Sequence, residues 1–150
     1  MTILDERVVL DTNIWIFGLR HHPELPACAL LLERLGQIQV ILPRQILLEL
    51  QANLTESELR TLFHLLKQFP KQIVIHWGKA EIENVRKYQS LGCKLGDAAI
   101  AAHLEELEVE TLITENRHFL KEIKDLPFRS LNATEALAEL EKIEGKMESS

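Results

Sequence analysis

The chain has 150 residues, of which 46% are hydrophobic, and a formal net charge of −6 from 17 basic and 23 acidic residues. This length is typical of one globular domain, and the acidic balance argues against a protein that coats nucleic acid through a broad basic face. The apolar runs are too short to span a bilayer and no secretory signal is visible at the N-terminus, so we expect a protein without membrane segments.

The two cysteines, Cys28 and Cys93, have neither the number nor the spacing of a disulfide scaffold or a zinc site. They are typical of small buried apolar side chains, which fits a reducing, cytoplasmic location. No repeat or linker divides the chain. We therefore expect residues 1–150 to form one domain, with frayed ends at residues 1–6 and 145–150.

Residues 7–13 predict a buried strand that ends on a carboxylate. Val8, Val9 and Leu10 form an apolar run of the kind found in strands covered on both faces, and the polar Asp11 follows at once. Open α/β sheets build their sites at the carboxyl ends of such strands. Asp11 is therefore either a site residue or only the cap of the next helix, and this stretch alone does not separate the two.

The following segments alternate between strand and helix patterns. We expect further strands at 37–42 and 110–114, a strand or an extended connection at 72–77, and an edge strand at 126–131, because Pro127 disfavours a central position. The expected helices lie after Asn13, at 27–35 with Gly36 as C-cap, after Pro43, and at 55–68, 79–90 and 95–104, with a last helix that Thr134 can cap. This alternation predicts an α/β domain with a mostly parallel central sheet.

Two of these helices have clear apolar faces. The helix at 55–68 begins with a capping box formed by Thr55 and Glu58. By helical spacing, the side chains expected to face the core are Leu59, Leu62, Phe63 and Leu66 in this helix, and Ile82, Val85 and either Tyr88 or Gln89 in the helix at 79–90.

Acidic and polar residues follow several of the predicted strands. Asp11, Glu49 and the stretch 114–116 can meet at one edge of a parallel sheet, and Asp97 joins them if its helix begins at that edge. Each acid also has a simpler interpretation. Glu49 could be an ordinary surface side chain, and Asp97 could only complement the helix dipole.

A hard divalent cation would resolve the repulsion between carboxylates gathered in one crevice. Mg²⁺ or Mn²⁺ takes oxygen ligands, keeps several waters and suits hydrolysis of phosphodiester bonds. The sequence lacks the glycine-rich loops of nucleotide-binding proteins and the Gly-x-Ser-x-Gly motif of serine hydrolases. A phosphatase with an aspartate nucleophile is disfavoured, because Asn13 stands where its second Asp is needed.

Taken in order, these motifs resemble the PIN domain family over nearly the whole chain. They are Val-Leu-Asp-Thr-Asn at 9–13, Glu49 in a helix after Pro43, Gly-Asp-Ala-Ala-Ile-Ala at 96–101, and Leu-Ile-Thr-Glu-Asn-Arg-His-Phe at 112–119. The resemblance implies a three-layer α/β/α sandwich and a metal-dependent ribonuclease, usually dimeric. Many bacterial members are the toxin of a VapBC-type toxin–antitoxin pair.

By position, the resemblance gives catalytic roles to Asp11, Glu49 and Asp97. Asp11 and Asp97 would be the principal ligands of Mg²⁺ or Mn²⁺. Glu49 would complete the metal site or orient the attacking water.

The resemblance also implies supporting roles for four polar residues. Thr12 and Asn13 would shape the turn beside Asp11, and Thr114 matches the hydroxyl after the last central strand. Asn116 departs from the family pattern, because many members carry an Asp there. A second metal site is therefore in doubt, and Glu115 cannot be assumed to replace the missing acid.

The leading hypothesis is a cytoplasmic, Mg²⁺- or Mn²⁺-dependent endoribonuclease, a homodimer by family inference, with an antitoxin as its protein partner if it is a toxin. The cations near the acidic residues in sequence, which are candidate RNA phosphate contacts, are Arg20, Arg44, Lys94 and Arg117. The alternative is a PIN-like module without catalysis that binds RNA or protein, which the neutral Asn116 and the net charge favour.

Overall fold

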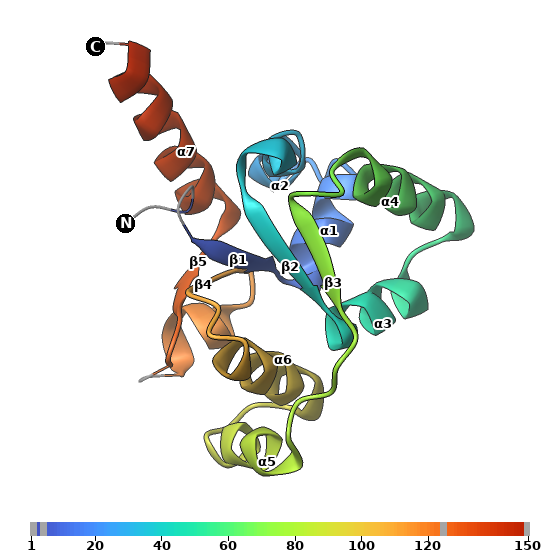
Figure 1. Cartoon of the computed structure of the whole chain (residues 1–150), viewed down its shortest axis with the longest axis vertical. Coiled ribbons are helices and arrows are strands. Elements are labelled where there is room, and N and C mark those ends of the chain that lie inside the picture. Colours follow the sequence, from blue (N-terminus) through green and yellow to red (C-terminus); the bar gives the residue numbers. More distant parts are fainter. Residues whose placement is uncertain (1–2, 4–5, 124–125, 149–150) are drawn as a thin grey trace.

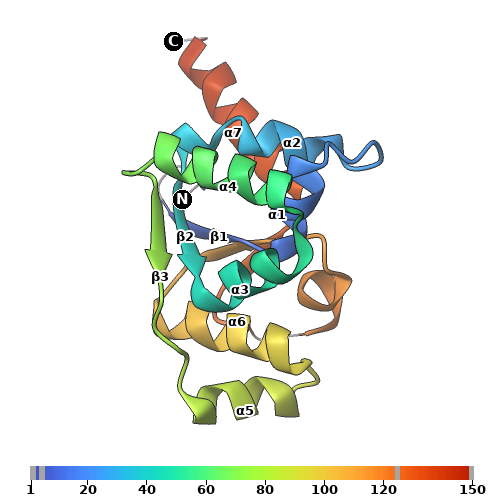
Figure 2. The ribbon, with the colours of Figure 1, turned by 90° about the vertical axis from the view of Figure 1, so that its right-hand side faces the viewer.

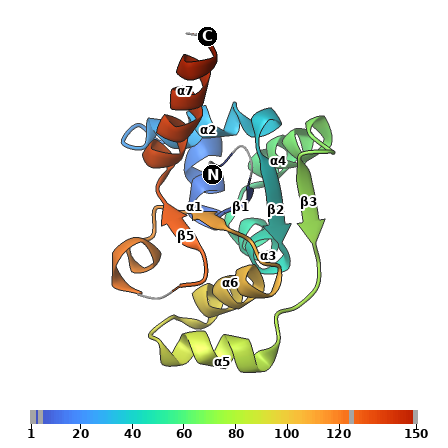
Figure 3. The ribbon, with the colours of Figure 1, turned by 60° about the vertical axis from the view of Figure 1, so that its left-hand side comes forward.

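The computed structural model describes residues 3, 6–123 and 126–148, with side chains described up to residue 142. Its strands form one five-stranded parallel sheet in the order β3-β2-β1-β4-β5 (Figure 1). The strands are β1 (Arg7–Leu10), β2 (Gln39–Pro43), β3 (Ile73–His76), β4 (Thr111–Ile113) and β5 (Arg129–Leu131). This confirms the α/β class with a parallel sheet, and β3 and β5 lie at its two edges (Figure 3).

Helices cover both faces of the sheet, which gives the three-layer sandwich (Figure 2). One layer contains α1 (Thr12–Leu19), α2 (Pro26–Leu32), α4 (Glu56–Gln68) and α7 (Ala133–Glu148), and the other contains α5 (Ile82–Ser90) and α6 (Leu95–Glu106). The helix α3 (Arg44–Asn53) contacts both α1 and α6. A short 3₁₀ helix, η1 (Leu35–Gln37), and a π-helical turn, η2 (His118–Glu122), complete the described elements.

The central strand β1 is buried on both faces. Val8, Val9 and Leu10 are all inaccessible to solvent, and the indole of Trp15 donates a hydrogen bond to the Leu10 carbonyl at 3.1 Å. The strand is therefore covered as its β-branched, apolar sequence predicted. None of the helices formed by the described residues has the length and apolar character needed to span a bilayer.

A partly exposed charge cluster joins the C-terminal part of the chain to the sheet. Arg129 on β5 contacts the carboxylates of Glu6, at 3.2 Å, and Glu139 on α7, at 2.9 Å. It also donates to the Thr111 hydroxyl at 2.9 Å.

The frayed ends expected from the sequence fall mostly on residues whose side chains lie outside the described part, but Ile3 and Glu6 are buried.

Several predicted details are wrong for identifiable reasons. The helix at 27–35 stops at Leu32, and Gly36 lies in η1, where a Cβ atom would come within 3.1 Å of the Phe69 ring. The side chain that caps α7 is Asn132 and not Thr134, since Asn132 accepts a hydrogen bond from the Glu135 amide at 2.8 Å.

The predicted apolar faces are only partly buried. Phe63 and Ile82 are 41% and 67% exposed, because Phe63 lies beside the edge strand β3 and Ile82 begins a helix that has no second helical layer over it. Leu62 is fully buried, as expected, and Tyr88 rather than Gln89 is the buried residue near the end of α5.

We expect Gly18→Ala to destabilise the fold although alanine favours helices. A Cβ atom at Gly18 would lie 2.5 Å from Cδ1 of Leu32 and 3.0 Å from the Cys28 carbonyl, so the packing of α1 on α2 must shift. Overpacking of this kind costs about 1–3 kcal/mol, more than the roughly 1 kcal/mol gained in helix propensity. Urea denaturation measures the difference.

The matched control is Gly96→Ala in α6, where the same added methyl group meets its neighbours at ordinary contact distances of 3.5 Å or more. This variant should unfold at the wild-type urea concentration or slightly above it. Equal stability of the Gly18 variant and the wild type would show that α1 and α2 are packed less closely than described.

Candidate active site

The site begins with the register between β1 and β4. Leu10 pairs with Ile113, so the next residue of each strand, Asp11 and Thr114, extends past the same edge of the sheet. The Asp11 amide donates to the Ile113 carbonyl at 2.9 Å, and the Thr114 hydroxyl donates to Oδ2 of Asp11 at 2.7 Å. The polar residues that follow two neighbouring strands therefore meet, as the sequence predicted.

Asp11 both caps a helix and lines a cavity. Its Oδ1 accepts a hydrogen bond from the Thr12 amide at 2.8 Å at the start of α1, and only 4% of the residue is exposed. Asn13 supports the same group, because its side-chain amide lies 3.5 Å from Oδ2 of Asp11 and 3.4 Å from the Thr114 hydroxyl. The cap and the site interpretations of Asp11 are thus compatible.

Glu49 reaches the site from α3. Its Oε1 accepts a hydrogen bond from the Thr12 hydroxyl at 2.9 Å, and its Oε2 accepts one from the Gln45 side chain at 3.0 Å. The side chain is half-buried. Two hydrogen-bond donors therefore hold this carboxylate in place, whereas an ordinary surface glutamate has no such donors.

Asp97 lies in the first turn of α6 and is half-buried. Its Oδ2 accepts a hydrogen bond from the side-chain amide of Asn116 at 3.2 Å. Asn116 is itself fixed, because its backbone amide donates to the Thr114 hydroxyl at 2.9 Å and its Oδ1 accepts from the His118 amide at 3.0 Å. The asparagine that departs from the sequence pattern thus links Asp97 to the end of β4.

The three acids line one cavity of about 290 Å³. Its lining consists of Asp11, Thr12, Asn13, Ile16, Phe17, Glu49, Asn53, Asp97 and Asn116. Thr114 is fully buried and contacts Asp11 without lining the cavity. The structure therefore brings the three acids together with the polar residues predicted to surround them, whereas Glu115 does not line the cavity and accepts a hydrogen bond from the Ala133 amide at 3.0 Å.

Burial raises the pKa of Asp11 to about 6. The hydrogen bonds from Thr114 and Thr12 favour the ionised carboxyl and oppose this rise, while the negative charges of Asp97 and Glu49 add to it. No positive charge on a described residue therefore compensates the ionised form of Asp11.

The donor set of the cavity fits a hard divalent cation, because it consists of carboxylate, hydroxyl and amide oxygens. Over the described ranges, no group of three or more His, Cys, Asp or Glu side chains is placed so that it could hold a metal ion. Mg²⁺ commonly uses one or two carboxylates and keeps its remaining waters, so it does not need three such side chains.

The cations suggested by the sequence lie outside the lining of this cavity. Arg20 is paired with Glu58 at 2.7 Å, and Arg44 lies over the ring of Trp77, with 6.0 Å between the guanidinium carbon and the ring centroid. Arg117 is exposed just before η2. Contact of Arg44 and Arg117 with RNA stays a prediction.

Sequence reasoning missed two side chains that support Glu49. Gln45 donates to its carboxylate, and Asn53 donates to its backbone carbonyl at 2.7 Å while lining the cavity. Both lie four residues from Glu49 on α3, so helical spacing could have identified them once Glu49 was chosen.

Comparison with known proteins identifies related sequences and folds. A family model described as PIN domain matches residues 8–125. The fold is similar to that of VapBC2 from Rickettsia felis bound to a DNA fragment from its promoter, with 22% identity, a TM-score of 0.57, and coverage of 84% of this chain and 98% of that chain. It is also similar to PAE2754 from Pyrobaculum aerophilum, with 13% identity, a TM-score of 0.57, and coverage of 93% and 98%. No curated protein matches the chain.

We expect Asp11→Asn to change the pH dependence of stability. Because the folded-state pKa of Asp11 is raised to about 6, its contribution to stability is full below pH of about 4 and is lost as the pH rises through about 6. In EDTA, the free energy of unfolding of the wild type should therefore fall by about 1–3 kcal/mol relative to that of the variant as the pH rises from about 4 to about 7, because Asn does not titrate. Urea denaturation at several pH values measures this difference.

Addition of Mg²⁺ at about pH 7 should remove most of this gain, since a cation in the cavity favours the ionised carboxyl of the wild type. A difference between the two proteins that stays constant with pH would contradict the burial of an ionisable carboxyl at this position.

Proposed function

Because this chain belongs to the PIN domain family, we propose that it is a metal-dependent endoribonuclease that hydrolyses RNA phosphodiester bonds in the cavity around Asp11, Glu49 and Asp97. PIN domains are generally nucleases. The observation that carries the proposal for this chain is the convergence of the three carboxyls on one cavity, with the buried Asp11 at its base.

Each of these side chains has a role that follows from its contacts. Asp11 and Asp97 would hold the cation through carboxylate oxygens, and a bound Mg²⁺ or Mn²⁺ would supply an activated water and neutralise charge on the phosphate. Glu49, fixed by Thr12 and Gln45, would orient the attacking water and accept its proton. Thr114 keeps the Asp11 carboxyl in one orientation.

The contacts of Asn116 support a site for one metal ion. Its Oδ1 accepts a hydrogen bond from the His118 amide and its nitrogen donates one to Asp97, so it brings no charge to the cavity. A second cation would lack the fourth carboxylate that many PIN domains supply. The same neutral residue is the observation that favours the alternative, a PIN-like module that binds RNA or protein without cleaving it.

The solved structure of VapBC2 from Rickettsia felis, which shares the fold, supports a further part of the proposal. We propose that the chain is the toxin of a VapBC-type pair, that an antitoxin protein binds it, and that it acts in the cytoplasm as a homodimer. An inhibitor of this kind would place a basic or apolar segment across the acidic cavity.

We expect the purified protein to cleave single-stranded RNA in Mg²⁺ or Mn²⁺ and not in EDTA. Asp11→Asn and Asp97→Asn should each lower the cleavage rate at least about a hundredfold, because each removes a charged metal ligand. Gel electrophoresis of labelled RNA measures the rate, and circular dichroism verifies folding.

The matched control is Glu56→Gln, which removes an exposed carboxylate that pairs only with Arg60 on α4. This variant should cleave at the wild-type rate. Binding of Mn²⁺ by calorimetry without cleavage of any RNA would favour the binding module, and absence of both binding and cleavage would overturn the nuclease assignment.

We expect Asn116→Asp to make stability depend more strongly on metal. The new carboxylate would replace a donor that lies 3.2 Å from Oδ2 of Asp97, so two like charges would face each other. Without metal, the melting temperature should fall by about 2–4 °C, and Mn²⁺ should raise it by more than it raises that of the wild type. Differential scanning calorimetry measures both values.

The same chemical change at Asn132, the N-cap of α7, should leave the melting temperature nearly unchanged, since Asp and Asn cap helices equally well. If Asn116→Asp responds to Mn²⁺ no more than the wild type does, the new carboxylate has no access to the cation, and a second metal site can be dismissed.

A further inference from the structure

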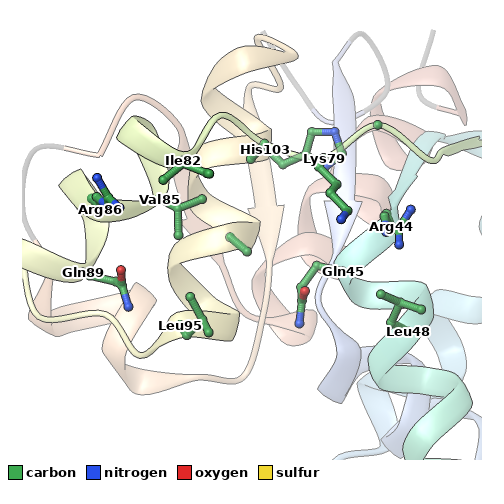
Figure 4. Close-up of a pocket in the computed structure, with 13 residues that line it drawn as sticks. Arg44, Gln45, Leu48, Lys79, Ile82, Val85, Arg86, Gln89, Leu95 and His103 are labelled. Atoms are coloured by element: carbon green, nitrogen blue, oxygen red, sulfur yellow. The ribbon is translucent and has the colours of Figure 1, made fainter.

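A second, larger cavity lies beside the acidic one, between α3, α5, α6 and the segment before α5 (Figure 4). Its volume is about 610 Å³. We call it the basic groove, defined by the cations Arg44, Lys79 and Arg86 and by the apolar side chains of Leu48, Ile82 and Leu95. Figure 4 shows Arg44 and Lys79 towards α3 and Arg86 on the opposite side, on α5.

The charge of this groove is opposite to that of the whole chain. Three cations line it, and no Asp or Glu is among its lining residues, although the net charge of the protein is −6. Within the part of the chain that the structure describes, neither Arg44 nor Lys79 nor Arg86 forms an ion pair. The groove therefore offers three uncompensated positive charges to an anionic ligand.

Apolar side chains lie exposed between these cations. Ile82 and Leu95 are 67% and 64% exposed, and Leu48 is 40% exposed. The indole of Trp77, 52% exposed, lies next to Arg44, which lines the groove. Proteins that bind single-stranded nucleic acids combine unpaired cations with apolar and aromatic surface, so that the phosphates contact the cations and the bases contact the apolar groups.

The basic groove lies directly beside the acidic cavity, since α3 and α6 contribute lining residues to both. Gln45 lines the groove and donates a hydrogen bond to Glu49, which lines the cavity. On α6, Leu95 lines the groove and Asp97, two residues later, lines the cavity. Gly96, between them, lets α6 approach α3 closely here, since a Cβ atom at this position would lie 3.5 Å from Glu49 and 3.6 Å from Gln45.

We propose that the basic groove binds the single-stranded RNA that extends to one side of the bond cleaved in the acidic cavity. Arg44, Lys79 and Arg86 bind successive phosphates, while Trp77 and the exposed apolar side chains contact the bases. This inference rests on the proposed nuclease function and adds to it the path of the substrate. An acidic peptide segment shares the charge complementarity, but the position of the groove beside the carboxyls of the cavity favours the RNA.

The test measures RNA binding in EDTA, so that binding is separated from cleavage. Fluorescence anisotropy follows an unstructured, fluorescein-labelled RNA of about 12 nucleotides over a range of salt concentrations. Arg44→Ala and Arg86→Ala should each weaken binding about tenfold at low salt and reduce the slope of log K against log salt by about 0.7. Arg60→Ala, which removes an exposed arginine on α4, should change neither value.

A crosslinking experiment adds a readout that does not depend on the variants. Irradiation of the complex with RNA that contains 4-thiouridine should attach nucleotides to the tryptic peptides 72–79 and 80–86, which carry Trp77 and Ile82. Crosslinks confined to other parts of the chain would overturn the proposed path.

The outcomes distinguish this inference from the function on which it rests. If the wild type cleaves RNA but both groove variants bind it with unchanged affinity and salt slope, the proposed path is overturned, the nuclease stands, and a protein segment becomes the occupant to test. If the wild type binds RNA through the groove but cleaves none, the path stands and the nuclease function fails. If it neither binds nor cleaves RNA, both are overturned.

Discussion

The parallel pairing of β1 with β4 is the constraint on which the rest of the site depends. Because Leu10 pairs with Ile113, the carboxyl of Asp11 and the hydroxyl of Thr114 meet just beyond the carboxyl ends of the two strands, although they are 103 residues apart in the chain. A shift of one residue in this pairing would turn Thr114 to the other face of the sheet. Through Thr114, the same pairing also places Asn116 and hence the donor to Asp97.

The site concentrates negative charge where the fold can tolerate it. Asp11 caps α1 and Asp97 lies in the first turn of α6, so two helix N-termini offset part of the repulsion between the acids. Burial nevertheless raises the pKa of Asp11 to about 6, which shows that this compensation is incomplete. The cavity therefore combines a stable scaffold with a locally unfavourable charge, which a bound cation would offset.

Strand positions and the identity of the acids could be predicted because each depends on local sequence. The run from Val8 to Leu10 specifies a buried strand, and the polar residues after β1 and β4 converge by topology alone. Burial at the periphery could not be predicted in this way. The exposure of Phe63 and Ile82 depends on which neighbours are absent, and the role of Gly36 depends on Phe69, more than thirty residues away.

The order of the strands has a consequence for folding. The central strand β1 is the first to be synthesised, yet its neighbour β4 follows about a hundred residues later, and the sheet cannot close before β4 is available. Pairings of such long sequence separation form slowly, because the entropy of a long loop is lost before the contact is gained. The hydrogen bond from Thr114 to Asp11 therefore forms late, and a nascent chain that ends before β4 has no assembled acidic cavity.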